Sequence, residues 1–240
     1  MSDTVLQVSD ITVTFGGTKA VDGFSAGIAL GEVVGLIGPN GAGKSTVINA
    51  ISGLVPQSGG TIVIDGVDVT RERPYRRSRR GVGRAFQRVA FAAGITVRDH
   101  LGAAGLRGAL MKRRALDETQ LELVRAAGLE RYLDIPVDEL SFLHRRLVGI
   151  LMAVIAGDRV VMLDEATAGL TDGERQRIGA MIIDWAAAAT RGFLVVEHDL
   201  EFVRQIATRT VVMDHGAVIA DGPTAEVLQD PAVVTAYMGN

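Results

Sequence analysis

Cysteine is absent from the 240-residue sequence, and so are long hydrophobic runs. Without cysteine there can be no disulfide bond, thiolate metal site or cysteine nucleophile. The longest apolar run, residues 147–157, has about half of the ~20 residues that a membrane-spanning helix needs. We therefore expect no transmembrane segment, although the mean hydropathy is +0.25. The N-terminal residues carry acids and no basic-then-apolar pattern, so no export signal is expected.

Positive net charge is lacking too. The formal net charge is −3, and only three of the 25 basic residues are lysines, one of them Lys44 in a glycine-rich segment. Because nucleic-acid-binding domains are usually basic, no nucleic-acid partner is expected. Eight arginines gather in residues 71–88 and could bind phosphates of nucleic acid or lipid. A solvated helix face is the favoured interpretation, since aromatic residues in this stretch are limited to Tyr75 and Phe86.

Strand-like and helix-like segments alternate along most of the chain. The apolar run 33–37 (VVGLI) suits a buried parallel strand. Residues 95–140 change to short helices rich in Ala, Leu and charge, without strand signals. The alternation predicts an α/β fold with a mainly parallel sheet, helices on both faces and an inserted helical subdomain. Further predicted strands are 5–8, 12–15, 61–65, 160–163, 193–196, 210–213 and 217–220, and further predicted helices are 46–54, 142–156 and 172–189.

A phosphate-binding loop is predicted directly after the 33–37 strand. Residues 38–45 (GPNGAGKS) match the pattern G-x-x-x-x-G-K-[ST], and a helix-like segment follows. Glycine backbones can wrap a phosphate with their N–H groups pointing inward, and the helix N-terminus adds positive potential. A glycine turn with a stray lysine is the alternative, which the flanking strand and helix disfavour. The residues expected to bind nucleotide here are Gly38, Asn40, Gly41, Gly43, Lys44, Ser45 and Thr46, with Lys44 on the β/γ-phosphates and Ser45 on Mg²⁺.

Two acids follow the apolar strand 160–163. Asp164 ends that strand, where ligands gather in open parallel sheets, and is expected to help hold Mg²⁺. Glu165 is placed to act on the attacking water as the catalytic base. The alternative is that the pair merely caps the next turn.

These motifs together resemble the ATP-binding subunits of ABC transporters, over nearly the whole chain. Gln87 in RAFQ resembles the Q-loop glutamine, and residues 168–172 (AGLTD) resemble the D-loop. His198, closing LVVEH, resembles the switch histidine, and Phe15 the aromatic residue that stacks on adenine. The sequence Phe15-Gly16-Gly17 and the ending 235–239 (TAYMG) are most similar to the hydrophobic and branched-chain amino-acid importer group. Lipopolysaccharide-export ATPases share several of these features.

The resemblance implies a P-loop ATPase core with a mainly parallel sheet, an antiparallel β subdomain and an inserted helical subdomain. It implies ATP hydrolysis with Mg²⁺, in which Gln87 contacts Mg²⁺ and the γ-phosphate and His198 holds the γ-phosphate, Glu165 and water in place. It also implies a second ATPase subunit, membrane permease subunits and, in importers, an extracytoplasmic binding protein, with this chain on the cytoplasmic face of the membrane. The expected organisation is one domain, 1–240, with 1–88 and 157–240 as core and 89–156 as helical subdomain.

The signature segment departs from the family pattern. Residues 140–144 read LSFLH where LSGGQ is expected, so Leu143 replaces glycine and His144 replaces glutamine. In the family this segment faces the γ-phosphate bound by the opposing subunit. A leucine side chain should block close approach or move the helix start. Ser141, Leu143 and His144 would thus serve a partner's ATP poorly, which predicts a heterodimer with one hydrolytic and one weak site.

Three alternatives stay open. The helix could tolerate Leu143, so that both sites of a dimer work. The chain could be a non-transport ABC-type ATPase, although such proteins usually carry tandem ATPase domains, a coiled-coil insertion or zinc modules that this sequence lacks. It could also be a regulatory ATPase with weak turnover, which the intact Glu165 disfavours.

Overall fold

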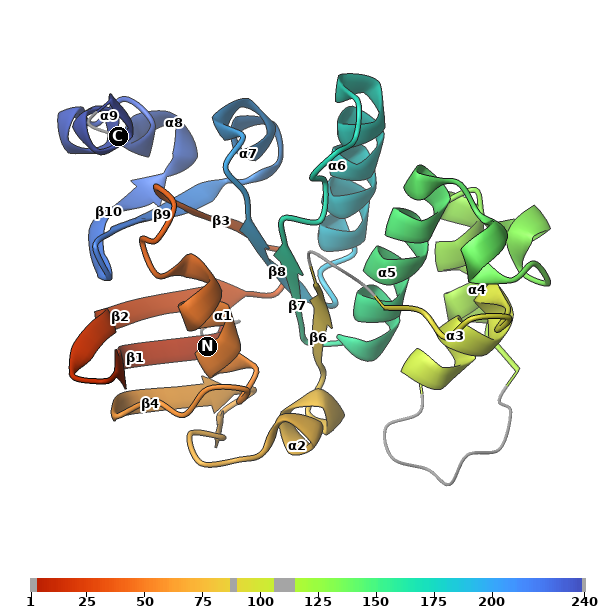
Figure 1. The fold of residues 1–240 in the computed structure, drawn as a ribbon, viewed down its shortest axis with the longest axis horizontal. Coiled ribbons are helices and arrows are strands. Elements are labelled where there is room, and N and C mark those ends of the chain that lie inside the picture. Colours follow the sequence, from red (N-terminus) through yellow and green to blue (C-terminus); the bar gives the residue numbers. More distant parts are fainter. Residues whose placement is uncertain (1–3, 87–89, 106–114, 239–240) are drawn as a thin grey trace.

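The computed structural model describes residues 4–86, 90–105 and 115–238, and its larger sheet is the predicted parallel one (Figure 1). The strand order is β10-β9-β3-β8-β7-β6, and only β10 runs antiparallel to its neighbour. Valine-, leucine- and isoleucine-rich runs form the central strands because both faces of this sheet are covered. The strands are β3 (Val33–Ile37), β6 (Val82–Ala85), β7 (Val160–Asp164), β8 (Gly192–Val196), β9 (Arg209–Asp214) and β10 (Ala217–Pro223).

A smaller antiparallel sheet has the order β2-β1-β4-β5. Its strands are β1 (Thr4–Phe15), β2 (Thr18–Ala29), β4 (Gly59–Ile64) and β5 (Val67–Asp68). The two short strands expected at 5–8 and 12–15 are one strand, and β2 was not predicted. The cause is an irregularity: Asp10 has a positive φ of 54°, and the register with β2 shifts between Val8 and Ile11. This bulge interrupts the apolar alternation from which strands are recognised.

The helices surround the larger sheet, and α3 to α5 form a group beside β6 and β7 (Figure 1). α5 has eight buried residues and packs on β6 and α3. The expected subdomain limits near 88 and 156 fall between β6 and α3 and between α5 and β7; the division itself stays a prediction. The helices are α1 (Lys44–Ile51), α2 (Pro74–Arg79), α3 (Val97–Ala104), α4 (Glu118–Ala126), α5 (Phe142–Ala156), α6 (Asp172–Ala187), α7 (Leu200–Ile206), α8 (Thr224–Val227) and α9 (Pro231–Met238).

Two hydrophobic clusters cover the two faces of the larger sheet. One joins α5, α6 and α7 to the sheet and continues into α3 and α4. The other joins the opposite face to α1 and the smaller sheet. Across the described residues, no helix is both long enough and apolar enough to cross a membrane.

Candidate nucleotide site

The phosphate loop, the strand-end acids and His198 come from three adjacent strands. β3, β8 and β7 are parallel neighbours, so their carboxyl ends meet at one edge of the sheet. The loop follows β3, His198 follows β8, and Asp164 ends β7. Open parallel sheets bind ligands at this edge. The fold therefore gathers residues that are more than 150 positions apart in the sequence.

Two loop glycines are required by close backbone approach. Gly38 has a φ of 147°, and a Cβ there would collide with the carbonyl oxygen of Met213 in β9. Gly43 has a φ of 103°, and its Cβ would lie 2.5 Å from the carbonyl oxygen of Ala20 in β2. The loop is thus wedged between two strands, which fixes its shape before any ligand arrives. Asn40 lies in the same loop; Ser45 and Thr46 lie in the first turn of α1.

The Lys44 side chain is buried inside this loop. Its Nζ donates to the carbonyl oxygens of Gly38 at 2.6 Å and Pro39 at 2.8 Å. Burial lowers the pKa of Lys44, and the carboxylates of Glu165 and Asp164 oppose that shift. The ammonium group therefore sits under the loop and within the field of both strand-end acids, where an anionic ligand would add a favourable charge.

Asp164 forms an ion pair with Arg84, a residue that was not predicted from the sequence. Arg84 in β6 donates from Nη2 to Asp164 Oδ2 at 2.8 Å and from Nη1 to Asn49 Oδ1 in α1 at 2.7 Å. Its guanidinium carbon lies 4.5 Å from the ring centre of Phe86. Burial lowers the pKa of Arg84, while its bond to Asp164 opposes this shift. In the sequence Arg84 was one of eight neighbouring arginines; the signal that distinguishes it is its place inside a short apolar strand.

Glu165 adopts a backbone conformation that is rare for a residue with a side chain. Its φ is +48°, and its N–H donates to the carbonyl oxygen of Val196 in β8 at 2.9 Å. Such conformations cost of order 1–3 kcal/mol and persist where the surrounding structure holds them, often at functional sites. The turn directs the chain away from β7 immediately after Asp164, so Glu165 begins the segment that leads to α6.

A second missed residue is Glu197, which precedes His198. Its side chain is 1% exposed, and Oε1 accepts hydrogen bonds from the N–H of Thr167 at 3.2 Å and from its Oγ1 at 2.8 Å. Burial raises the pKa of Glu197, and the bonds from Thr167 and the nearby His198 act in the opposite direction. His198 is exposed, with Nδ1 4.0 Å from Glu197 Oε2. The segments that follow β7 and β8 are thus linked next to His198.

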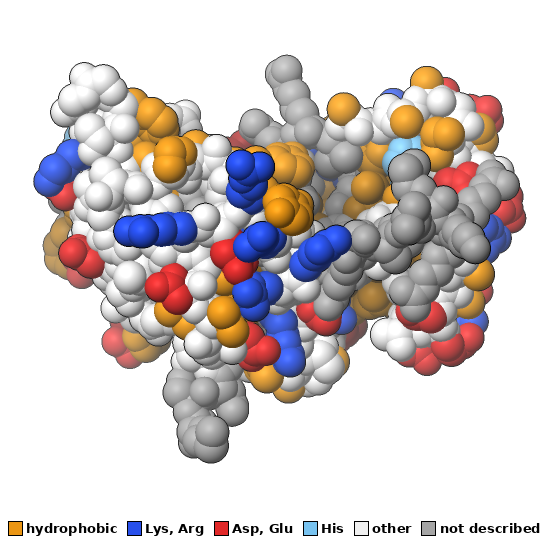
Figure 2. Space-filling model, turned by 90° about the horizontal axis from the view of Figure 1, so that it is seen from below, with side chains coloured by type: hydrophobic (Ala, Val, Ile, Leu, Met, Phe, Trp, Pro, Cys, Tyr) orange, Lys and Arg blue, Asp and Glu red, His pale blue; other side chains and the backbone are white. Residues whose placement is uncertain are grey.

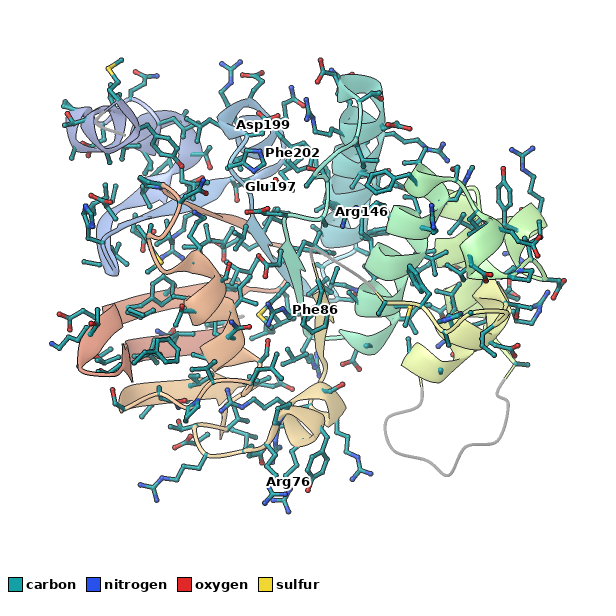
Figure 3. All side chains as sticks on the ribbon, in the orientation of Figure 1. Arg76, Phe86, Arg146, Glu197, Asp199 and Phe202 are labelled. Carbon is teal, nitrogen blue, oxygen red and sulfur yellow. The ribbon has the colours of Figure 1, made fainter. Side chains whose placement is uncertain are left out.

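Arg146, which projects from α5, contacts the segment that follows Glu165 (Figure 3). Its Nη2 donates to the carbonyl oxygen of Ala168 at 3.2 Å. Burial lowers the pKa of Arg146, and the charge of Glu197 partly restores it. The segment after Glu165 is therefore held between α5 and β8. Nothing in the sequence marked Arg146, because it follows His144 and Arg145 in the same helix and its contact with Ala168 is 22 positions away.

Phe15 ends β1 and is 52% exposed. Gly16 and Gly17, both with positive φ, turn the chain tightly into β2. That same strand carries Ala20, whose carbonyl contacts the phosphate loop at Gly43. An exposed aromatic ring on a hairpin that abuts the loop is suited to stacking on a base.

The signature residues lie at the start of α5 instead of on the sheet edge. Ser141 is the N-cap; its Oγ accepts from the N–H of His144 at 3.4 Å and lies 2.7 Å from His144 Nδ1. The His144 ring lies 4.2 Å from that of Tyr132, centre to centre. Leu143 is half-buried and packs against the helical core, and the helix begins at Phe142. Gln87, predicted as the Q-loop residue, lies outside the described residues.

Comparisons with known proteins show the family of the chain. The ABC transporter family matches residues 21–168, and the family described as branched-chain amino acid ATP-binding cassette transporter matches residues 217–240. The chain is 32% identical to the high-affinity branched-chain amino acid transport ATP-binding protein BraF of Pseudomonas aeruginosa, covering 100% of this chain and 99% of that one. LivG of Escherichia coli, a protein of the same description, is 31% identical over the same shares.

Solved structures give the same result. A nucleotide-free ATP-binding cassette from an ABC transporter has a TM-score of 0.86 and 28% identity, covering 99% of this chain and 100% of that one. An ABC transporter cassette in its ADP conformation has a TM-score of 0.87 and 29% identity, with 99% of each chain covered. The predicted family, fold and ATPase activity are confirmed. The chain belongs to the ABC transporter family and is an ATP-binding subunit whose ATPase activity is coupled to transport.

Proposed function

We propose that this subunit binds ATP with Mg²⁺ at the edge formed by β3, β8 and β7, and that it powers import of branched-chain or related hydrophobic amino acids. The observation that carries the site is the meeting of the phosphate loop, Asp164 and His198 at that edge. The relatives BraF and LivG and the match of residues 217–240 support the substrate class. The partners are membrane permease subunits, with the chain at the cytoplasmic face, and an extracytoplasmic binding protein.

The residues present fit Mg²⁺ bound together with a nucleotide. Ser45 is exposed, and its hydroxyl has no hydrogen-bond partner among the described residues. Asp164 presents one oxygen to Arg84, which leaves the other for a metal-bound water. No cluster of three or more acidic or histidine side chains able to hold a metal occurs in the described part of the chain. Mg²⁺ is usually bound by a few protein ligands together with phosphate oxygens of the substrate. When bound, the ion would neutralise part of the phosphate charge.

The chain's own residues supply binding, orientation and proton transfer. Lys44 moves from the loop carbonyls to phosphate oxygens, and the loop N–H groups bind the phosphates. Glu165 accepts a proton from the attacking water, and His198, exposed beside it, holds the γ-phosphate. Phe15 stacks on the base. Gln87, which the resemblance assigns to the Q-loop, would contact Mg²⁺ and the γ-phosphate.

We further propose a heterodimer in which the site completed by this chain's signature is the weak one. Burial and the charges of Arg131 and Arg177 lower the pKa of His144, which favours its neutral ring. With Nδ1 as acceptor, the Ser141 hydroxyl donates to His144 at 2.7 Å. That proton is then not available to a phosphate on the opposing subunit. His144 therefore weakens the signature by competing for the Ser141 proton, and Leu143, which packs against the helical core, replaces the expected glycine.

The test restores the signature to the isolated chain. Leu143→Gly combined with His144→Gln should raise ATP turnover by about 100-fold, the size of effect expected when one donor to a developing negative charge is gained. Arg145→Gln on the same helix turn is the matched control and should leave turnover unchanged. Lys44→Ala in the restored background should abolish turnover. Robust turnover by the unaltered isolated chain, or no gain on restoration, would contradict the asymmetric dimer.

The transport role is tested in cells. Lys44→Ala in the native host should abolish uptake of labelled leucine, isoleucine or valine, because the phosphate loop loses its cation. Purification of the tagged chain in mild detergent should recover permease subunits and a second ATPase subunit with an intact signature. Unchanged uptake with Lys44→Ala would show that catalysis at this site does not drive that transport.

A further inference from the structure

An open hollow of about 870 Å³ lies beside α2, outside the nucleotide site. Its lining includes Arg71, Arg73, Arg76 and Tyr75, from or next to α2, and Thr61 from β4. Figure 2 views the molecule from the α2 side and shows Lys and Arg side chains gathered on that face. We call this feature the arginine hollow. It contains three of the eight arginines of residues 71–88, and the ATPase site leaves these three without a role.

The acids of the hollow are already engaged by other groups. Glu72 accepts two bonds from Arg80, at 2.9 and 2.7 Å, which hold its pKa below the usual value. Asp68 accepts from the N–H of Thr70 at 2.8 Å, and hydrogen bonds from Thr70 lower its pKa. Both carboxylates therefore stay ionised within the fold. Glu72 is paired with Arg80, and Asp68, whose pKa Arg71 also lowers, offsets part of the positive charge of the hollow.

Three arginines are left as exposed cations. Among the described residues, Arg71, Arg73 and Arg76 form no ion pair with a carboxylate. Arg77 differs because it is buried and donates to main-chain carbonyls, including that of Ala50 at 2.6 Å. Arg77 thereby fixes α2 and the turn before it against the core. The three exposed arginines therefore project from a segment whose backbone is held in place.

Tyr75 adds an amphipathic aromatic ring at the rim. It is 53% exposed, and the guanidinium carbons of Arg76 and Arg79 lie 6.0 and 5.9 Å from its ring centre. Arg76 also donates to its hydroxyl at 3.2 Å. Aromatic side chains with a polar tip are favoured at the headgroup level of bilayers. Arginines on either side of such a ring can bind lipid phosphates while the ring lies at the level of the headgroups.

We propose that the arginine hollow binds the phosphate groups of anionic phospholipids and rests α2 on the bilayer that contains the permease. The proposal rests on the chain being a subunit of a membrane transporter and not on the proposed substrate. Guanidinium groups suit phosphate because their N–H donors match its oxygens. An acidic protein segment is the other possible occupant, but apart from Tyr75 the lining is polar and gives a peptide no apolar pocket for anchoring.

The net charge makes the test specific. Since the whole chain carries −3, its overall field does not favour an anionic surface, and binding must come from a local patch. The full chain is sedimented at low salt with vesicles of phosphatidylcholine alone or of a two-to-one mixture with phosphatidylglycerol. Binding should require phosphatidylglycerol and weaken with salt. Arg71→Gln, Arg73→Gln and Arg76→Gln together should lower the partition coefficient about 100-fold, since each arginine contributes about five-fold.

The matched control removes three exposed arginines elsewhere. Arg125→Gln, Arg145→Gln and Arg204→Gln change the net charge equally but lie on other elements. This variant should bind the mixed vesicles like the unaltered chain, and both variants should retain ATP turnover. Equal losses in the two variants, or no preference of the unaltered chain for phosphatidylglycerol, would overturn the proposal. If the triple variant misfolds, Arg71→Gln alone must still show the five-fold step.

Discussion

The contact between Glu197 and Thr167 gives a prediction that can be measured in full. The Glu197 carboxylate is buried at the end of β8 and accepts two bonds from Thr167, one from the main chain and one from the hydroxyl. Thr167→Val removes only the hydroxyl donor. Glu197→Gln keeps an acceptor oxygen but removes the charge. The two substitutions and their combination form a double-mutant cycle.

The magnitude follows from the charge on the acceptor. A hydrogen bond to a charged group contributes about 2 kcal/mol, and one between neutral groups about 1 kcal/mol. Thr167→Val should therefore lower the free energy of unfolding by about 2 kcal/mol in the chain that retains Glu197, and by about 1 kcal/mol in the Glu197→Gln variant. The coupling energy is expected at about 1 kcal/mol, measured by urea denaturation at pH 8.

The pH dependence has a definite sign. Burial raises the pKa of Glu197 in the folded chain above its ordinary value of 4.5. Its stabilising contribution is complete below that value and is lost as the pH rises through the raised folded pKa. Glu197→Gln cannot titrate, so its stability relative to the unaltered chain should improve as the pH rises from acidic to neutral. Thr167→Val removes the hydroxyl bond, which lowers this pKa, and should move the loss to higher pH.

Two outcomes would refute this reasoning. A coupling energy below about 0.5 kcal/mol, a value usual for independent sites, would show that the carboxylate does not depend on the hydroxyl of Thr167. A constant stability difference between Glu197→Gln and the unaltered chain across the pH range would show that Glu197 has no raised pKa. Turnover measured on the same variants reports whether the link also positions Glu165, since a purely stabilising role leaves kcat unchanged.

Three further predictions concern the nucleotide site. Arg84→Met leaves Asp164 buried without its partner and should cost about 3 kcal/mol of stability in urea denaturation. Gly43→Ala must displace strand backbone, so denaturation and calorimetric ATP binding should show a larger loss than for Gly41→Ala, which has positive φ but no atom within 4 Å of its Cβ. Phe15→Ala should weaken ATP binding about five-fold, the lower end of base stacking, while the melting temperature stays unchanged because the ring is exposed.

Local signals were sufficient to predict the central strands and the loop. The run 33–37 and the following glycines define a strand, a turn and a helix within a short stretch of sequence, and the structure has β3, the loop and α1 there. β1 was predicted as two strands because the bulge at Asp10 interrupts the alternation of apolar and polar residues. From that alternation alone, a bulge cannot be distinguished from a chain reversal. Errors of this kind arise where tertiary pairing continues a strand through locally unfavourable residues.

The residues that support the site could not be predicted from sequence. Arg84 meets Asp164 from 80 positions away, and Glu197 meets Thr167 from 30 positions away. Both contacts depend on the order of parallel strands, which places β6 beside β7 and β7 beside β8. A polar residue inside or at the end of an apolar strand is the local trace of such a contact. Such a residue indicates that a hydrogen-bond or ion-pair partner exists, but the sequence does not identify that partner.

The start of α5 connects the two halves of the proposed dimer mechanism. Its first turn carries Ser141 and His144, which in the resembling family serve the opposing subunit, and Arg146 lies next along the helix. Arg146 donates a hydrogen bond to the carbonyl oxygen of Ala168, in the segment that follows Glu165. The helix therefore connects the predicted signature to Ala168, whose N–H in turn donates to the carbonyl oxygen of Glu165 at 3.2 Å. Restoring the signature could act through a partner or within one chain, and protein concentration separates the two: an effect through dimerisation must vanish on dilution, whereas an effect through Arg146 must persist.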